Sequence, residues 1–162
     1  MKVIGIDPGL NGAIAVLQEN RVKEIFDVPV MPEGKKNKRQ LNSAQLVKLL
    51  KDIVSNNEEV VVIVENVSAM PGQGVTSMFN FGQTFGAIKG ICAALGLPIF
   101  FVRPAKWKKH FDLINSQKDS SRTKVIQMFP KISSLLKRKK DANKADAILI
   151  ASFHENFIKS DK

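Results

Sequence analysis

The chain opens with Met1-Lys-Val-Ile-Gly-Ile-Asp-Pro-Gly-Leu-Asn-Gly-Ala-Ile-Ala-Val-Leu17, and this segment predicts two strands of one sheet. Val3-Ile-Gly-Ile6 is short, apolar and β-branched, as buried strands are, and a second apolar run follows the Pro8-Gly9 turn. Asp7 stands between the two runs. Because a carboxylate in an apolar setting costs free energy unless a cation neutralises it, Asp7 is a candidate metal ligand.

Outward from this segment, the apolar runs and turn residues alternate along the whole chain. We expect strands at 2–7, 12–18, 21–28, 60–64 and 98–102, and helices at 43–54, 78–95, 120–129 and 143–157. Ser43 is the expected N-cap of the first helix. The segment 29–42 reads as a mobile basic loop, either a solvated linker or a flap that contacts phosphates. Three antiparallel strands followed by alternating helices and strands predict an α/β fold, with a five-stranded mixed sheet and helices on both faces.

Composition limits the classes of function. Lys and Arg number 25 against 15 Asp and Glu, and the net charge of +10 suits nucleic acid better than an anionic membrane surface. No stretch has the length of a signal peptide or a membrane span. The single cysteine, Cys92, excludes an internal disulfide and fits a reducing cytoplasm. We therefore expect one cytoplasmic domain over residues 1–162, without a membrane partner.

Two further carboxylates are expected beside the same core as Asp7. Glu65 closes the apolar run 60–64, and Asp146 stands near the start of the most apolar helix. Each could be a buried acid paired with Arg or Lys. Three acids at one core favour a cation instead, because carboxylates raise one another's pKa and oxygen ligands select Mg²⁺ or Mn²⁺. Two such ions about 4 Å apart are typical of phosphodiester hydrolysis.

The chain resembles the RuvC family of Holliday junction resolvases. The resemblance rests on Gly5-Ile-Asp-Pro-Gly-Leu10, Val64-Glu65 and Lys144-Ala-Asp-Ala147, and Arg103-Pro-Ala-Lys-Trp-Lys108 is similar to its divergent bacteriophage-type members. It implies a ribonuclease H-like fold and a Mg²⁺-dependent endodeoxyribonuclease with two metal ions per site, in which Mn²⁺ can substitute. It further implies a homodimer that nicks two opposing strands of a four-way DNA junction, in recombination and repair. The dimer seam is expected on the helix at 78–95.

Carried over by position, Asp7, Glu65 and Asp146 match three of the four catalytic and metal-binding acids of the family. The fourth position is Asn143, whose carbonyl can ligate a cation but brings no charge. Three interpretations remain. Asn143 is a tolerated metal ligand, or nearby Asp141 supplies the missing carboxylate, or the replacement of the acid by Asn143 inactivates the enzyme. In the last case the alternative function is a protein that binds branched DNA with weak or no cleavage. A nucleotide-binding kinase-like fold also opens with an Asp-Gly turn, but it needs two such domains, so no small-molecule substrate is expected.

Candidate DNA contacts lie in three basic segments, and the last of them immediately precedes the helix that carries Asp146. Basic side chains are expected to hold phosphates without reading sequence. They are Arg103, Lys106, Lys108, Lys109, Lys118, Arg122, Lys137, Arg138, Lys139 and Lys140. Phe79 is a candidate wedge between base steps at the exchange point, whereas Phe81, Phe85 and Trp107 are expected in the core.

Overall fold

The structure, a computed structural model, describes residues 1–34, 37–54 and 58–155. Its strands are β1 (Lys2–Ile6), β2 (Ala13–Gln18), β3 (Arg21–Asp27), β4 (Val30–Pro32), β5 (Arg39–Leu41), β6 (Val60–Glu65) and β7 (Ile99–Val102). Its helices are α1 (Ser43–Ile53), α2 (Val75–Ala94), α3 (Pro104–His110), α4 (Ser120–Met128) and α5 (Ala142–Ser152), with 3₁₀ turns η1 (Pro130–Leu136) and η2 (Lys139–Asp141).

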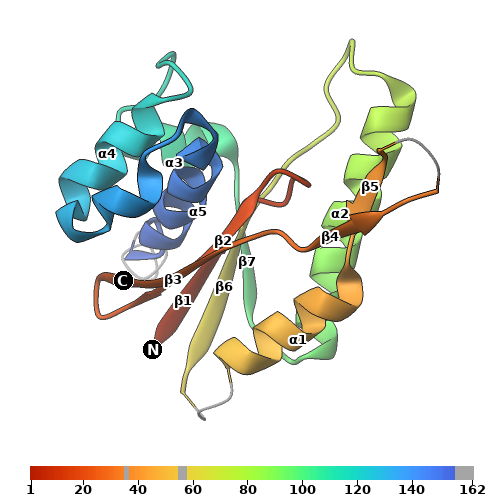
Figure 1. Ribbon diagram of the computed structural model, residues 1–162, viewed down its shortest axis with the longest axis horizontal. Helices are drawn as coiled ribbons and strands as arrows, with labels where there is room; N and C mark the ends of the chain where they lie inside the picture. Colours follow the sequence, from red (N-terminus) through yellow and green to blue (C-terminus); the bar gives the residue numbers. More distant parts are fainter. Residues whose placement is uncertain (35–36, 55–57, 156–162) are drawn as a thin grey trace.

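The main sheet has five strands in the order β3-β2-β1-β6-β7. The first three strands form the antiparallel meander that the turn residues predict, and β6 and β7 add to β1 in parallel. Helices α3, α4 and α5 lie on one face of the sheet, and α1 and α2 lie on the other (Figure 1). The expected mixed sheet with helices on both faces is confirmed.

Alternation along the strands divides the core into two clusters. Val3 of β1 and Ile63 of β6 pack with α5 on one face, whereas Ile4 and Val62 pack with α1 and α2 on the other. Because side chains two residues apart share a face, the residues that follow on the α5 side are Asp7 after β1 and Glu65 at the end of β6. Strand periodicity therefore directs both acids toward α5.

Gly5 allows α5 to approach β1 closely. A Cβ atom at this position would collide with the backbone carbonyl of Ala147 and would lie 2.6 Å from the backbone nitrogen of Ala151. Since β1 and α5 meet at backbone distance here, the neighbouring Asp146 lies beside the end of β1. The glycine is thus required for the meeting of Asp7 and Asp146.

Several local expectations were wrong. The segment 29–42 contains the antiparallel hairpin of β4 and β5, apart from residues 35–36, which lie outside the described residues. Asn42, not Ser43, caps α1, because its side chain accepts a hydrogen bond from the backbone N–H of Gln45 at 3.0 Å. Helix α2 begins at Val75, earlier than expected, and α5 ends at Ser152, with 156–157 outside the described residues.

Candidate metal centre and nucleic-acid interface

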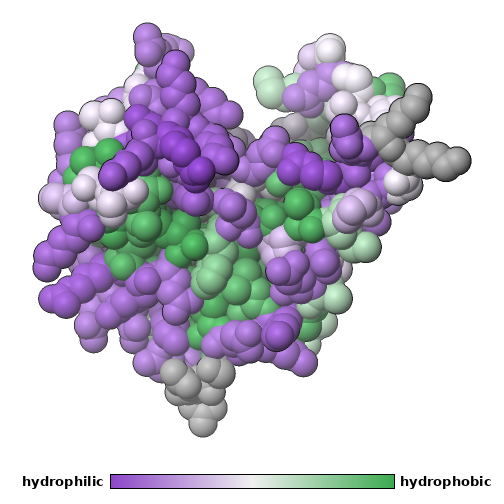
Figure 2. All heavy atoms as spheres, in the orientation of Figure 1, coloured by the Kyte–Doolittle hydropathy of each residue, from purple (hydrophilic) through white to green (hydrophobic). Residues whose placement is uncertain are grey.

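Three carboxylates lie where β1, β6 and α5 come together. Asp7 follows the last residue of β1, Glu65 ends the neighbouring parallel strand, and Asp146 belongs to the second turn of α5. The charges of Asp7 and Asp146 raise the pKa of Glu65, and the charge of Asp7 also raises the pKa of Asp146. The space-filling view shows a notch above this edge of the sheet, between the part over α3 and α4 and the part over α2 (Figure 2). Tertiary structure therefore brings the three predicted acids into one neighbourhood.

Burial and mutual repulsion favour the protonated forms of these acids. The pKa of Glu65 is raised to about 7, chiefly by burial and also by the charges of Asp7 and Asp146, against a hydrogen bond from Trp107 that lowers it. Burial likewise raises the pKa of Asp146 to about 6, against a hydrogen bond from Ser121. The pKa of Asp7 is also raised by burial. The site thus holds negative charge in a setting that only a cation or a proton can relieve.

Neutral donors hold two of the carboxylates. The indole Nε1–H of Trp107 donates to Oε1 of Glu65 at 2.9 Å, and the buried Ser121 hydroxyl is hydrogen-bonded to Asp146. Both donors come from the α3–α4 segment. Sequence reasoning placed Trp107 in the core, where it lies, but missed its contact with Glu65; Ser121 was missed altogether. The only available signal was that a buried indole N–H needs an acceptor.

The donor set fits a hard divalent cation. Oδ1 of Asp146 is buried and lacks a hydrogen-bond partner within the described part of the chain, which leaves an acceptor beside two further acids. As placed, no three Asp, Glu, His or Cys side chains among residues 1–34, 37–54 and 58–155 meet closely enough to hold a metal ion. Carboxylates that repel one another move together when a cation neutralises them, so the chemistry of these oxygen ligands suits a hard divalent cation.

Asn143 faces the turn after β1. Its side-chain Nδ2 donates a hydrogen bond to the backbone carbonyl of Asn11 at 2.7 Å, and Oδ1 remains as its acceptor. The Oδ1 of Asn11 in turn accepts a hydrogen bond from Arg39 of β5 at 2.7 Å. The position expected to hold a fourth acid therefore ties α5 to the turn that carries Asp7.

Asp141 is paired with basic residues of its own segment. Its side chain is 3% exposed and binds the Arg138 guanidinium, with Oδ1 at 3.0 Å from Nη2, and its Oδ2 accepts from the backbone N–H of Arg138 at 2.8 Å. Lys144 adds a second cation at 3.7 Å. These contacts lower the pKa of Asp141, and both of its carboxylate oxygens are used in contacts within the protein. Of the three interpretations of Asn143, these contacts favour a tolerated ligand or an inactivating replacement over compensation by Asp141.

The ten predicted basic residues fall into three groups: those that act on the acids, those that form ion pairs, and those that are exposed. Lys108 and Lys118 act on the ionisation of Asp7 and Asp146, so both lie near the acids. Arg122 pairs with Asp119, Nε to Oδ1, at 3.0 Å, and Arg138 pairs with Asp141. The remaining residues are exposed on α3 and around η2; they are Arg103, Lys106, Lys109, Lys137, Lys139 and Lys140. Binding of DNA by any of the ten stays a prediction.

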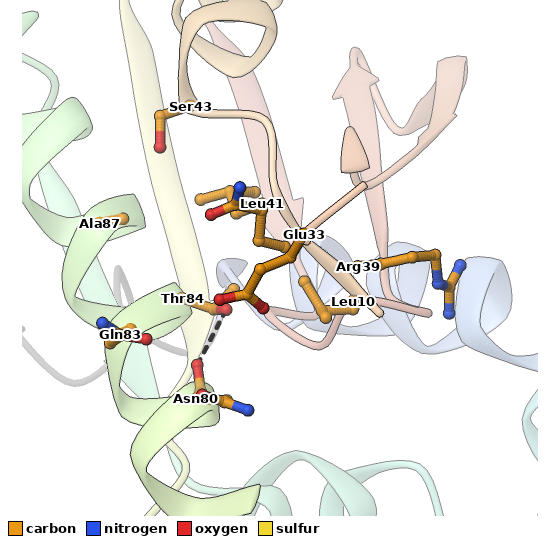
Figure 3. A pocket seen from close by; sticks show the side chains of 10 residues that line it. Leu10, Glu33, Arg39, Leu41, Ser43, Asn80, Gln83, Thr84 and Ala87 are labelled. Carbon is orange, nitrogen blue, oxygen red and sulfur yellow. Dashed lines mark hydrogen bonds between the residues drawn. The ribbon is translucent and has the colours of Figure 1, made fainter. Parts of the chain in front are cut away.

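A cavity with many basic residues in its lining lies between the turn after Asp7, the start of α5 and the hairpin. Its volume is about 470 Å³, and its lining includes Arg39, Lys118, Arg138, Lys140, Asn143 and Lys144. A second cavity of about 340 Å³ lies between the hairpin and α2 (Figure 3). Glu33, Arg39 and Leu41 form one wall, and Asn80, Gln83 and Thr84 face them from α2. Both cavities are polar and open beside the turn that carries Asp7.

Phe79 is an exposed aromatic on the first turns of α2. Its exposed fraction is 66%, whereas Phe81 is half-buried and the half-buried Phe85 packs against Phe101 with ring centroids 5.7 Å apart. Phe79 is thus the accessible member of the three, in agreement with its predicted contact with bases. The contact itself stays a prediction.

Comparisons with known proteins agree with this geometry. The family model for the crossover junction endodeoxyribonuclease RuvC matches residues 3–154. The chain is 26% identical to the protein of that name from Saccharopolyspora erythraea over 157 residues, which are 95% of this chain and 76% of that protein. It is 33% identical to the protein from Nitratidesulfovibrio vulgaris over 110 residues, 66% of this chain and 64% of that protein.

Solved structures share the fold. The chain superimposes on T. thermophilus RuvC in complex with Holliday junction substrate with a TM-score of 0.64 at 18% identity, covering 100% of this chain and 97% of that one. It superimposes on the fowlpox virus Holliday junction resolvase with a TM-score of 0.54 at 15% identity, covering 100% of both. The predicted ribonuclease H-like fold is confirmed. Within the described residues, no helix is both long and apolar enough to cross a membrane.

Proposed function

The chain belongs to the RuvC family of crossover junction endodeoxyribonucleases, and from this premise we propose that it resolves four-way DNA junctions by metal-dependent phosphodiester hydrolysis. The observation that carries the proposal is the convergence of Asp7, Glu65 and Asp146 at one edge of the sheet, where burial penalises all three charges. Such a cluster has no structural benefit without a cation. Its carboxylate oxygens are the kind of ligand that divalent-metal hydrolysis uses, and a bound cation would draw the three acids closer together.

In this proposal Asp7, Glu65 and Asp146 bind two Mg²⁺ ions, for which Mn²⁺ can substitute, and the Asn143 carbonyl is a weaker fourth ligand. The chemistry that such ions supply when bound is activation of a water and stabilisation of the leaving oxygen. The residues of the chain provide the rest. Lys108 and Lys118 bring positive charge beside the acids, and so attract the scissile phosphate to a site that would otherwise repel it.

The substrate is held through its backbone. The exposed basic residues of α3 and η2, on the same side as α5, provide phosphate contacts that do not depend on sequence. Phe79 contacts the bases at the exchange point from α2. Arg122 contributes only if its pair with Asp119 opens, so it is the weakest member of the predicted set.

Cleavage of two symmetry-related DNA strands requires two active sites, which a homodimer provides. We place its seam on α2, because Gly82, Gly86 and Gly90 recur every four residues and a Cβ atom at any of them would meet nothing within 4 Å. No described part of the chain packs on this stripe, so a second helix can approach it closely. A single domain, a cytoplasmic site of action and a bacteriophage origin complete the proposal, as predictions.

The test is a cleavage assay on a fixed four-way junction with Mg²⁺ or with EDTA. We expect paired nicks by the parent in Mg²⁺, none in EDTA, and a loss of at least about 10³-fold for Asp7→Asn. Junction binding measured in Ca²⁺ should be retained by Asp7→Asn. Asp112→Asn is a matched control, since this acid is exposed and is not among the charges that act on the ionisation of the three. Cleavage in EDTA, or full activity of Asp7→Asn, would refute the proposal.

A second candidate function is recognition of branched DNA without cleavage. It is favoured by one observation, the use of the Asn143 amide as a donor to Asn11 where the family has an acid. The same assay separates the two functions. A parent that binds the junction tightly and leaves it intact in Mg²⁺ and Mn²⁺ would establish the binding protein.

A further inference from the structure

Trp107 is completely buried, and its polar atom contacts a proposed metal ligand. The side chain is 0% exposed, within the cluster that includes Val102 and Ile63, and its indole Nε1–H donates to Oε1 of Glu65 at 2.9 Å. It is the only tryptophan of the chain. A buried indole needs one acceptor, but a backbone carbonyl would satisfy it without burying a charge. The choice of a carboxylate therefore calls for a reason beyond packing.

A short, rigid path fixes the two side chains relative to each other. Glu65 pairs with Val102 in the parallel β6–β7 ladder, and the backbone N–H of Asn66 donates to the carbonyl of Val102 at 2.7 Å. Helix α3 starts immediately afterwards, with Arg103 as N-cap and Pro104 at its first position. Pro104 has a fixed φ angle, which orients the helix as it leaves the strand. Trp107 thus returns over the end of β6 with little freedom.

A cation lies on the ring of the same indole. The Nζ atom of Lys108 is 5.5 Å from the centre of the Trp107 ring, so the ring faces a positive charge while its N–H edge faces a negative one. A cation on the ring polarises the N–H group and strengthens its donation to the carboxylate. The indole therefore connects the basic residues beside the site to the acid within it.

We propose that Trp107 is the positioning residue of Glu65: its N–H holds Oε1, fixes the orientation of the carboxylate, and leaves Oε2 to bind the divalent ions. This inference rests on the proposed function, because it assumes that Glu65 is a metal ligand. Donors that orient metal-binding side chains usually change metal affinity by about 10–100-fold when they are removed. Trp107 itself touches neither metal nor DNA, and it acts through Glu65.

The first measurement needs no metal. Because the chain has one tryptophan, a ¹H–¹⁵N spectrum contains a single indole cross peak. We expect this peak far downfield in the parent and shifted upfield in Glu65→Ala, which removes the acceptor. In Asp7→Asn, which keeps the acceptor, the peak should stay close to its parent position. An indole peak that does not move in Glu65→Ala would overturn the proposal.

The second measurement is Mn²⁺ binding to the full chain without DNA, by electron paramagnetic resonance. Trp107→Phe removes the donor and keeps an aromatic ring; replacement of Trp107 by 3-benzothienylalanine removes only the N–H and keeps the volume. Phe111→Leu is the packing control, since Phe111 is buried in the same cluster. We expect Mn²⁺ affinity to fall by about 10–100-fold in both Trp107 variants, and by less than about threefold in Phe111→Leu, in which the donor is intact.

The outcomes separate this inference from the proposed function. Parent-like Mn²⁺ affinity in the benzothienylalanine protein, together with loss of affinity in Asp7→Asn, would overturn the inference and keep the metal centre. Absence of Mn²⁺ binding by the parent would overturn both. If Trp107→Phe fails to fold, the benzothienylalanine protein decides, because its side chain has the shape of the original.

Discussion

The side-chain amide of Asn143 donates a hydrogen bond to the backbone carbonyl of Asn11 at 2.7 Å, across 132 residues of sequence. This bond ties the first turn of α5 to the turn that follows Asp7. An aspartate at this position could not donate it, and its charge would face a carbonyl oxygen. The amide is therefore suited to holding the turn in a way that the family's usual acid is not.

For Asn143→Asp we expect a trade between stability and metal affinity. Loss of the bond to Asn11 should lower the free energy of unfolding by about 1–2 kcal/mol without metal. The added charge should tighten Mn²⁺ binding. Urea denaturation and Mn²⁺ titration measure the two effects, with Asn143→Ala as the control that loses the bond and adds no charge. An Asn143→Asp protein as stable as the parent would contradict the donor role. Cleavage by this variant but not by the parent would show that Asn143 is inactivating.

The raised pKa values predict how stability depends on pH. Glu65 and Asp146 have pKa values of about 7 and about 6 in the folded protein, above their usual 4.5 and 3.8. Between the unfolded and the folded pKa values, the folded state binds more protons than the unfolded state. The free energy of unfolding therefore falls as the pH rises through this range. We expect the unfolding free energy without metal to be about 1–3 kcal/mol lower at pH 8 than at pH 5.

Two comparisons test the cause of this pH dependence by urea denaturation. Glu65→Gln should flatten the profile, because its side chain does not ionise, and Mg²⁺ should restore stability at the alkaline end. Glu24→Gln is the control, since Glu24 is an exposed acid of β3, outside the site. A profile that rises between pH 5 and pH 8 would show that other groups dominate.

Gly5→Ala should destabilise the fold by about 1–3 kcal/mol through overpacking. The new methyl group would collide with the Ala147 carbonyl and with the backbone nitrogen of Ala151, so α5 must move away from β1. Thermal or urea unfolding measures the loss. Because two of the three nearest atoms belong to the backbone, the second change Ala151→Gly should rescue little of it. Full rescue would mean that the side chain of Ala151, not the helix backbone, limits the approach.

Phe79→Ala should separate DNA chemistry from folding. Since Phe79 is 66% exposed, its truncation should change stability by less than about 0.5 kcal/mol. Loss of an aromatic contact with a base costs about 1–3 kcal/mol, so opening of the exchange point and cleavage should drop by about 5–100-fold. Fluorescence of 2-aminopurine placed at the exchange point reports the opening. Val75→Ala, an exposed apolar residue of the same helix, is the control. Equal fluorescence with parent and Phe79→Ala would exclude the wedge.

Gly86→Arg should weaken the dimer and leave the protomer folded. Nothing lies within 4 Å of a Cβ atom at this position, so the protomer has room for the side chain, whereas a second α2 packed on the stripe does not. We expect the dissociation constant to rise by about tenfold or more, because the interface would bury an unpaired charge. Sedimentation equilibrium measures it. Thr123→Arg, an exposed position on α4, should leave the dimer unchanged. A Gly86→Arg protein that dimerises like the parent would place the seam elsewhere.

The strands and their faces could be read from local pattern. The apolar runs at 2–7 and 60–64 have the period of buried strands, and this period sets Asp7 and Glu65 on the same side as α5. Local pattern could not identify the N-cap of α1, because two neighbouring residues have similar preferences for that position. Asn42 and Ser43 are comparable N-caps, and only the geometry of the incoming chain selects Asn42. The β4–β5 hairpin was missed because each of its strands has only three residues and its support comes from Leu41, which is buried against distant residues.

The amino-acid order alone thus specified which acids follow which strands, because strand periodicity and turn chemistry act over a few residues. Tertiary structure decided which donor holds each acid. The pairs Trp107–Glu65 and Asn143–Asn11 join residues 42 and 132 positions apart, and no local period relates them. It also decided that Asp141 pairs with Arg138, a choice between two nearby roles for one carboxylate. Side-chain partners depend on how helices pack across a sheet, and that packing is a property of the whole chain.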